Sequence, residues 1–332
     1  MTDVSAPTDA DVATASTARR LLPIAAYLGG ALLGAILLVA AWAKLLDPAS
    51  FASQIEREGL AFVLPAQAVA LIAIALEIGI GALLLLGVRR LWVLLPTTGL
   101  VAFFLFLTGR TYLGFLRGEI ADEPGCGCFG NLIDRSPAEA FWQDLGLMVP
   151  TLALAWIGAR ALAPRQPWLR IGAAALLTVV GTGVAHLSPQ LPLDDLATRL
   201  KPGMVTAEMC VGDEGARICV ETAIPELAEG RHWVMIAGLE DEAFLAAVPA
   251  LNERHWDGEG PTLWLLSDAD EDALFALRWS ADPAFDVREA PTALLRPMYR
   301  TLPRSFLVED GVVVRTITAL PPAESPIASA AR

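Results

Sequence analysis

Two cysteines separated by a single glycine are the residues whose spacing most directly indicates chemistry. The segment Cys126-Gly127-Cys128-Phe129-Gly130 places both thiols immediately before an apolar stretch. In an oxidising compartment, thiols at this spacing can close a disulfide, and Gly127 gives the backbone the freedom that so small a ring requires. Such a ring is expected to be strained and therefore easily exchanged, which suits the relay of electrons.

Two other interpretations of Cys126 and Cys128 stay open. Their disulfide can serve only as a local clip that shapes the loop, and two thiolates are also ligands for a soft metal such as Cu(I). The chain has three histidines, and neither these nor the methionines cluster near the motif. No metal site is predicted, and thiol–disulfide exchange is the favoured chemistry.

A second cysteine pair, Cys210 and Cys219, flanks a predicted hairpin. If Glu214-Gly215 forms a two-residue turn, the two cysteines face each other at a non-hydrogen-bonded position. Cα atoms at such a position are about 4.5 Å apart, which a disulfide can bridge. The sequence therefore predicts a cross-strand disulfide, either a structural staple or an exchange partner for the first pair.

The composition indicates what must position these groups. Of the 332 residues, 55% are hydrophobic and only 18% are charged, and the mean hydropathy is +0.51. A soluble domain is less apolar and more highly charged, so membrane-spanning segments are expected. Residues 190–332 hold 24 acidic against 12 basic residues, whereas the preceding part is nearly balanced. An acidic domain without a basic patch makes nucleic acid an unexpected partner.

Five apolar runs reach the length of about 20 residues that a helix needs to cross the lipid bilayer. The first run resembles a signal peptide at its ends, but it is longer than a signal-peptide core, so we expect a retained helix. The five runs are residues 21–44, 61–88, 91–116, 141–163 and 167–187.

The short loops favour one orientation in the membrane. Arginines gather in alternate connections, whereas the remaining loops are mixed or acidic. The positive-inside rule then places the N-terminus in the cytoplasm. The membrane that we expect is the inner (plasma) membrane of a bacterium. The loop with Cys126 and the whole C-terminal half are expected in the periplasm. The arginines are Arg19, Arg20, Arg89, Arg90, Arg160, Arg165 and Arg170.

Glu77 lies near the middle of the second span, where an unpaired carboxylate is costly. It can act as a proton relay or contact a quinone head group, or it can pair structurally with Lys44 or Arg110. Asp144, near the start of the fourth span, is a further candidate for an intramembrane polar site. No cofactor site is identifiable from the sequence, and a quinone is the cofactor that remains open.

The membrane half resembles the MauE branch of the DoxX-like family over about residues 25–160. The resemblance implies a four-helix bundle and a redox-associated protein of methylamine utilisation, thought to help form disulfides in exported partners. It assigns the central role to Cys126 and Cys128, while the fifth span goes beyond the family pattern. The matching features are Lys44, Pro48, Glu77-x-Gly-x-Gly81, Cys126-Gly-Cys128-Phe-Gly130 and Phe141-Trp-x-Asp144.

Strand-like and helix-like segments alternate after residue 203 and end in a hairpin around Asp310-Gly311. Their order is similar to the thioredoxin-like fold, with Pro303 at the place of its cis-proline and Pro249 within a helix. This alignment puts Asp241-Glu-Ala-Phe244 where the family carries Cys-x-x-Cys, so ordinary thioredoxin chemistry is not expected there. The edge at Pro303 is the expected client-docking site.

The predicted fold is an all-α transmembrane bundle, with a four-helix MauE-like core and a fifth span, followed by an α/β thioredoxin-like domain. The expected function is support of disulfide formation or maturation of an exported thiol-containing client, with a membrane oxidant that resets the cysteines. The alternative is a non-catalytic, membrane-anchored assembly factor. The predicted parts are a disordered tail (1–20), the membrane domain (21–187), a linker (188–202), the periplasmic domain (203–322) and a tail (323–332).

Overall fold

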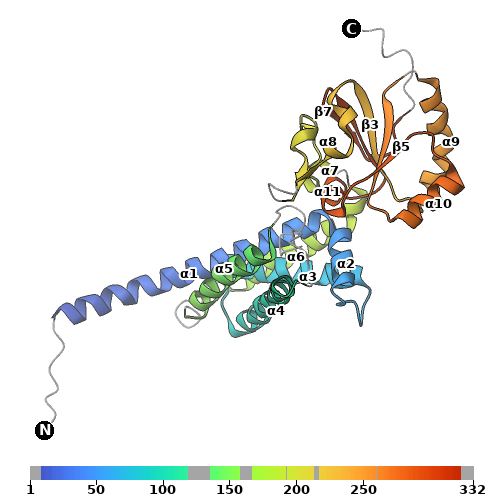
Figure 1. Ribbon diagram of the computed structural model, residues 1–332. Helices are drawn as coiled ribbons and strands as arrows, with labels where there is room; N and C mark the ends of the chain where they lie inside the picture. Colours follow the sequence, from blue (N-terminus) through green and yellow to red (C-terminus); the bar gives the residue numbers. More distant parts are fainter. Residues whose placement is uncertain are drawn as a thin grey trace, which may run out of the picture. The chain divides into compact units, whose positions relative to one another are not determined.

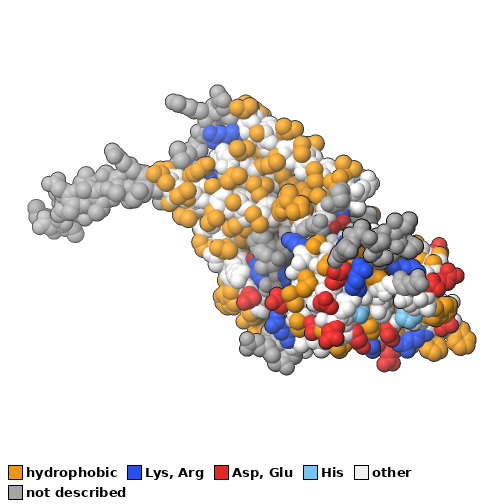
Figure 2. Space-filling model, turned by 90° about the horizontal axis from the view of Figure 1, so that it is seen from above, with side chains coloured by type: hydrophobic (Ala, Val, Ile, Leu, Met, Phe, Trp, Pro, Cys, Tyr) orange, Lys and Arg blue, Asp and Glu red, His pale blue; other side chains and the backbone are white. Residues whose placement is uncertain are grey.

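The computed structural model describes residues 9–118, 135–157, 167–191, 193–212, 217–258 and 260–322. The chain divides into two compact units, residues 1–191 and 192–332 (Figure 1). The described part of the first unit is helical, whereas the second is built around a five-stranded sheet. Hydrophobic side chains cover the visible surface of the helical unit, and charged side chains gather on the second unit (Figure 2).

Among its described residues the first unit has six α-helices, and five of them are long and apolar enough to cross a membrane, as predicted. The remaining helix is short and follows the first span directly. Asp47 caps it by accepting a hydrogen bond from the backbone of Ser50 at 3.0 Å, and Pro48 occupies its first turn. The helices are α1 (Asp9–Leu46), α2 (Pro48–Arg57), α3 (Ala66–Leu85), α4 (Leu91–Leu116), α5 (Pro137–Ile157) and α6 (Pro167–Leu187).

The second and fourth spans begin elsewhere than the apolar runs indicate. Residues 61–64 are apolar, yet they lie outside α3, which starts only after Pro65. Proline lacks a backbone N–H and restricts the residue before it, so a helix commonly starts next to it. Pro137 begins α5 in the same way, four residues ahead of the predicted start.

Helices α1 and α3 approach each other at two glycines. A Cβ atom at Gly34 would lie 2.6 Å from the carbonyl oxygen of Gly81, and one at Gly81 would lie 2.9 Å from that of Gly34. No larger residue fits at either position without a backbone shift. Small residues at such contacts let helices pack closely where lipid supplies no hydrophobic driving force.

The sheet of the second unit has the strand order β5-β4-β3-β6-β7. Its first three strands in the chain are parallel and joined through α9 (Glu242–Asp257) and α10 (Glu271–Ala281), and the last two form an antiparallel hairpin. This is the thioredoxin-like arrangement that the sequence predicts. The strands are β3 (Arg231–Ile236), β4 (Thr262–Ser267), β5 (Asp286–Glu289), β6 (Arg304–Glu309) and β7 (Val312–Ile317).

Alternate residues of the central strands enter two separate cores, one on each face of the sheet. Trp233 and Met235 pack with Phe244 and Val248 of α9, whereas Val234 and Ile236 face the opposite core. That second core is closed by the short helices α8 (Val220–Ala223) and α11 (Thr292–Leu295), by the turns next to them, and by Leu200, which follows α7 (Asp194–Ala197) (Figure 1). The period of two along each strand places side chains on both faces.

Strand β5 was not predicted from the sequence. This strand has only four residues, Asp-Val-Arg-Glu, which are mostly polar and include no run of β-branched or aromatic residues. The strand forms because it pairs in parallel with β4 at the edge of the sheet. An edge strand needs burial on fewer sides, so a polar sequence is tolerated there.

The close approach of α1 and α3 predicts that Gly34→Ala destabilises the protein, whereas Gly99→Ala does not. Gly99 lies in the interior of α4, and a Cβ there would meet nothing within 4 Å. We expect the Gly34 change to lower the free energy of unfolding by about 1–3 kcal/mol, as overpacking does. Thermal unfolding in detergent, followed by circular dichroism, measures both; equal losses of stability would contradict the packing.

Candidate functional site

A buried ion pair joins α1 and α3. Lys44 Nζ, in the last turn of α1, contacts Glu77 Oε1, and the two side chains are 3% and 0% exposed. Of the two partners expected for Glu77, Lys44 is confirmed. Arg110 of α4 is instead paired with Glu58, which directly follows α2.

Aromatic rings surround the ammonium group of this pair. Lys44 Nζ lies 5.1 Å from the ring centroid of Phe51 and 5.0 Å from that of Phe104, which are cation–π distances. Within the described residues, the second carboxylate oxygen of Glu77 has no hydrogen-bond partner. Lys44 therefore compensates the charge of the buried carboxylate through a contact with one of its two oxygens.

Asp144 of α5 also has a buried partner, which was not predicted from the sequence. Arg135 Nη1 lies 3.2 Å from Asp144 Oδ1, and both side chains are buried. Arg135 stands just before α5, and Asp144 is the eighth residue of this helix, so the ion pair ties the start of the span to its third turn. A nearby stack of Tyr112 on Phe141, with ring centroids 5.5 Å apart, adds to the contact between α4 and α5.

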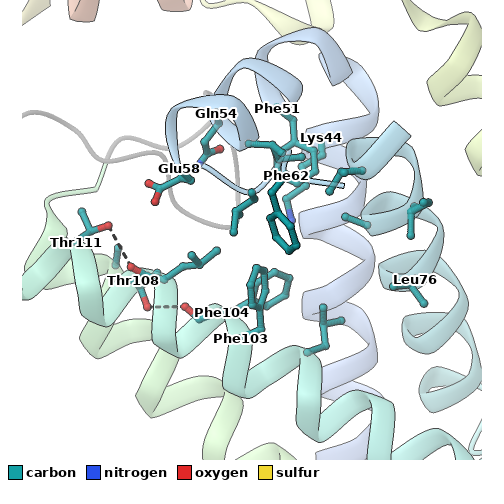
Figure 3. Close-up of a pocket in the computed structure, with 18 of the residues that line it drawn as sticks. Lys44, Phe51, Gln54, Glu58, Phe62, Leu76, Phe103, Phe104, Thr108 and Thr111 are labelled. Carbon is teal, nitrogen blue, oxygen red and sulfur yellow. Dashed lines mark hydrogen bonds between the residues drawn. The ribbon is translucent and has the colours of Figure 1, made fainter. Parts of the chain in front are cut away.

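A cavity of about 370 Å³ lies within the helical unit, beside Lys44 (Figure 3). The end of α1, helix α2, the segment after it, α3, α4 and the start of α5 all contribute to its wall. The wall is mostly apolar and includes four phenylalanine rings, Phe51, Phe62, Phe103 and Phe104. Polar groups are contributed by Lys44, Gln54, Glu58, Thr108 and Thr111.

The cavity reaches the outer surface of the helices. Its wall includes Ile72 and Leu76 of α3 and Phe103 of α4, whose side chains are all exposed. In a membrane-spanning helix, exposed apolar side chains of this kind face the lipid. A lipid-soluble molecule could therefore enter from the bilayer.

Cys126 and Cys128 lie outside the described residues, in the segment 119–134 between α4 and α5. Thr111 of α4 and Pro137 of α5, which stand on either side of this segment in the sequence, both line the cavity. The chain thus leaves the cavity wall and returns to it, and both cysteines are in the intervening stretch.

The predicted disulfide of the second unit is present. Cys210 and Cys219 are bonded to each other and pair directly between β1 (Cys210–Val211) and β2 (Ile218–Cys219), in the predicted register. Their Cα atoms are 3.9 Å apart. Both residues are half-buried, so this disulfide lies near the protein surface.

The start of α9 carries a carboxylate cap in place of thiols. Asp241 Oδ1 accepts a hydrogen bond from the backbone N–H of Ala243 at 2.9 Å, which satisfies a donor of the first helical turn. Pro249 lies within α9 and the peptide bond before Pro303 is cis, as the alignment predicts. A hollow of about 320 Å³ beside the cap is lined by residues 236–241, residues 266–269, Ala273, Tyr299 and Leu302.

Neither the cavity nor the pair Glu58–Arg110 was predicted from the sequence. The single charged residue inside the third apolar run, Arg110, was the signal that a partner had to exist. Among the described residues, no group of three or more histidine, cysteine and acidic side chains is arranged to hold a metal ion. The side chains that line the cavity can form hydrogen bonds, carry a proton and contact an apolar ring.

The buried pair predicts a strongly non-additive double-mutant cycle. Lys44→Met leaves the Glu77 carboxylate without its cation, and we expect a loss of about 3–5 kcal/mol of stability. The double variant Lys44→Met, Glu77→Gln removes both charges and should recover most of that loss. Thermal unfolding of the four proteins in the cycle measures the coupling.

The exposed pair is the control for this cycle. Arg110→Gln removes a cation whose side chain is 54% exposed, so it should cost no more than about 1 kcal/mol. Additive effects of the two changes at positions 44 and 77 would show that the buried contact contributes nothing.

Comparisons with known proteins give a family match for part of the chain and a weak likeness to a solved structure. No curated protein matches the chain. A crystal structure titled as a putative thiol:disulfide interchange protein DsbE from Chlorobium tepidum matches 37% of this chain and 89% of that chain, with 15% sequence identity and a TM-score of 0.29. Residues 22–157 match the model of the family described as methylamine utilisation protein MauE, so the resemblance is confirmed for the first four spans.

Proposed function

We propose that the protein is a membrane-bound thiol–disulfide oxidoreductase that supports disulfide formation or maturation of an exported protein. Cys126 and Cys128 are the cycling pair. They lie inside the segment that matches the MauE family and between two of its spans. The family description concerns methylamine utilisation, so an exported, thiol-containing protein of that process is the first client to test.

The observation that carries this proposal is the disulfide between Cys210 and Cys219 in the second unit. Disulfides persist in oxidising compartments such as the bacterial periplasm. If each of the five helices crosses the membrane once, segment 119–134 and the second unit emerge on the same side. Cys126 and Cys128 then share that oxidising compartment, where thiol–disulfide exchange can run.

The reaction balances as an exchange of one disulfide for another. A client thiolate attacks the Cys126–Cys128 disulfide, and a mixed disulfide forms while one cysteine leaves as a thiolate. The second client thiolate then attacks the mixed disulfide, which releases the oxidised client and leaves both cysteines reduced. Two electrons and two protons have passed to the pair, and a membrane oxidant must remove them before the next cycle.

The second unit supports an alternative function, that of a non-catalytic assembly factor. Its specific support is the hollow next to the Asp241 cap, which Tyr299 and Leu302 border immediately before Pro303. An extended segment of an exported client could bind there without any exchange of thiols. In this alternative, the membrane helices serve as an anchor and Cys126 and Cys128 are a structural clip.

Replacing the cysteine pairs separately distinguishes the two functions. Under the proposal, Cys126→Ser, Cys128→Ser leaves the client thiols reduced, whereas Cys210→Ser, Cys219→Ser retains most client oxidation. Acid quenching of intact cells, alkylation and mass spectrometry measure the state of every cysteine. We also expect Cys126 and Cys128 to occur as a mixture of thiol and disulfide that shifts with respiration.

The contrary result is equally specific. Full client oxidation in the Cys126→Ser, Cys128→Ser variant, together with loss of maturation in a Leu302→Asp variant, would reject the redox function and establish the assembly factor. Permanent oxidation of both cysteine pairs in wild-type cells would also favour the assembly factor over the redox function.

A further inference from the structure

The cavity beside Lys44 combines an apolar entrance with a polar end. Figure 3 shows Gln54, Glu58, Thr108 and Thr111 toward one end and Leu76 toward the other, with the rings of Phe103 and Phe104 between them. The volume of about 370 Å³ falls within the range of small-molecule sites. The occupant that fits is a ring-sized, amphipathic molecule whose apolar tail extends past Leu76 toward lipid.

The charges of the wall favour a head group without net charge. Lys44 and Glu58 are the only ionisable side chains among the described residues that line the cavity. Lys44 is paired with Glu77, and Glu58 is paired with Arg110. The cavity therefore offers no uncompensated cation to a phosphate, and a phospholipid head group is poorly matched to it.

The polar groups offer both donors and acceptors to a neutral ring. The hydroxyls of Thr108 and Thr111 donate to the carbonyl oxygens of Phe104 and Leu107, at 3.0 and 3.1 Å, so their lone pairs can still accept. The Lys44 ammonium has three protons and uses one toward Glu77. A quinone carbonyl requires a donor and a quinol hydroxyl requires an acceptor, and this wall supplies both.

We propose that this cavity binds the head group of a lipid-soluble quinone, which enters between α3 and α4 and is the oxidant of the cysteine pair. The redox role rests on the proposed function above, whereas the binding site does not. In the redox step, the thiols of Cys126 and Cys128 lose two electrons and two protons and form a disulfide. The quinone gains the same electrons and protons and leaves as the quinol.

The test uses the full-length protein in phosphatidylcholine nanodiscs that contain no quinone. The probe is a short-tailed benzoquinone with a photoreactive azide, and labelled peptides are identified by mass spectrometry. We expect saturable labelling of peptides from α3 and α4 that unlabelled short-tailed ubiquinone competes away. Phosphatidylglycerol should not compete.

Two tryptophan substitutions in the spans form a matched pair. Ala73 lines the cavity, so Ala73→Trp fills it and should weaken labelling at least tenfold. Ala102 of α4 is exposed and does not line the cavity, so Ala102→Trp should label as wild type does. If Ala73→Trp fails to fold, Thr111→Val provides a second, nearly isosteric variant, for which we expect several-fold weaker labelling.

Three results would overturn the inference. They are wild-type labelling of a folded Ala73→Trp or Thr111→Val protein, competition by phosphatidylglycerol, and loss of labelling in a Cys126→Ser, Cys128→Ser variant. The last result would show that the probe reacts with thiols rather than occupying the cavity. Retained labelling in that variant supports the site even if the client test rejects the redox function, so the two failures are distinguishable.

Discussion

The buried contact between Lys44 and Glu77 is the constraint on which the helical unit depends. Two charges that are shielded from water can be retained only if they meet, so α1 and α3 must bring these side chains together. The glycines Gly34 and Gly81 permit this approach, because any side chain there would push the two backbones apart. Charge pairing and close backbone packing thus act on the same pair of helices.

The two units bury apolar surface by different rules. The spanning helices expose many large apolar side chains on their outer surface, and they bury further leucine and isoleucine side chains together with the Lys44–Glu77 pair inside, as expected of helices whose surroundings are lipid. In the second unit, alternate residues of each central strand enter separate cores on the two faces of the sheet, and few charged residues are buried. The surroundings of the chain therefore change from lipid to water between the spans and the acidic domain.

The cavity exists because the helices do not close completely around the ion pair. Helix α2 and the segment after it fold beside α3 and α4, and the phenylalanine rings leave room for one more ring. An apolar cavity open toward lipid, with paired charges at its wall, fits a neutral redox molecule of the membrane. An oxidant bound in this cavity would lie on the side of the bundle where α4 ends and α5 begins. From there it could oxidise the proposed pair of cysteines.

The sequence by itself determined the five spans, the α/β fold of the second unit and the Cys210–Cys219 register, because apolar length, strand alternation and the short sequence separation of the two cysteines are local properties. Only the tertiary structure decided that Lys44 and not Arg110 pairs with Glu77, that Glu58 takes Arg110, and that polar β5 joins the sheet. The cavity could not be predicted from the sequence either. Its wall comes from residues between Lys44 and Ala140, and contacts over such separations depend on how the helices pack.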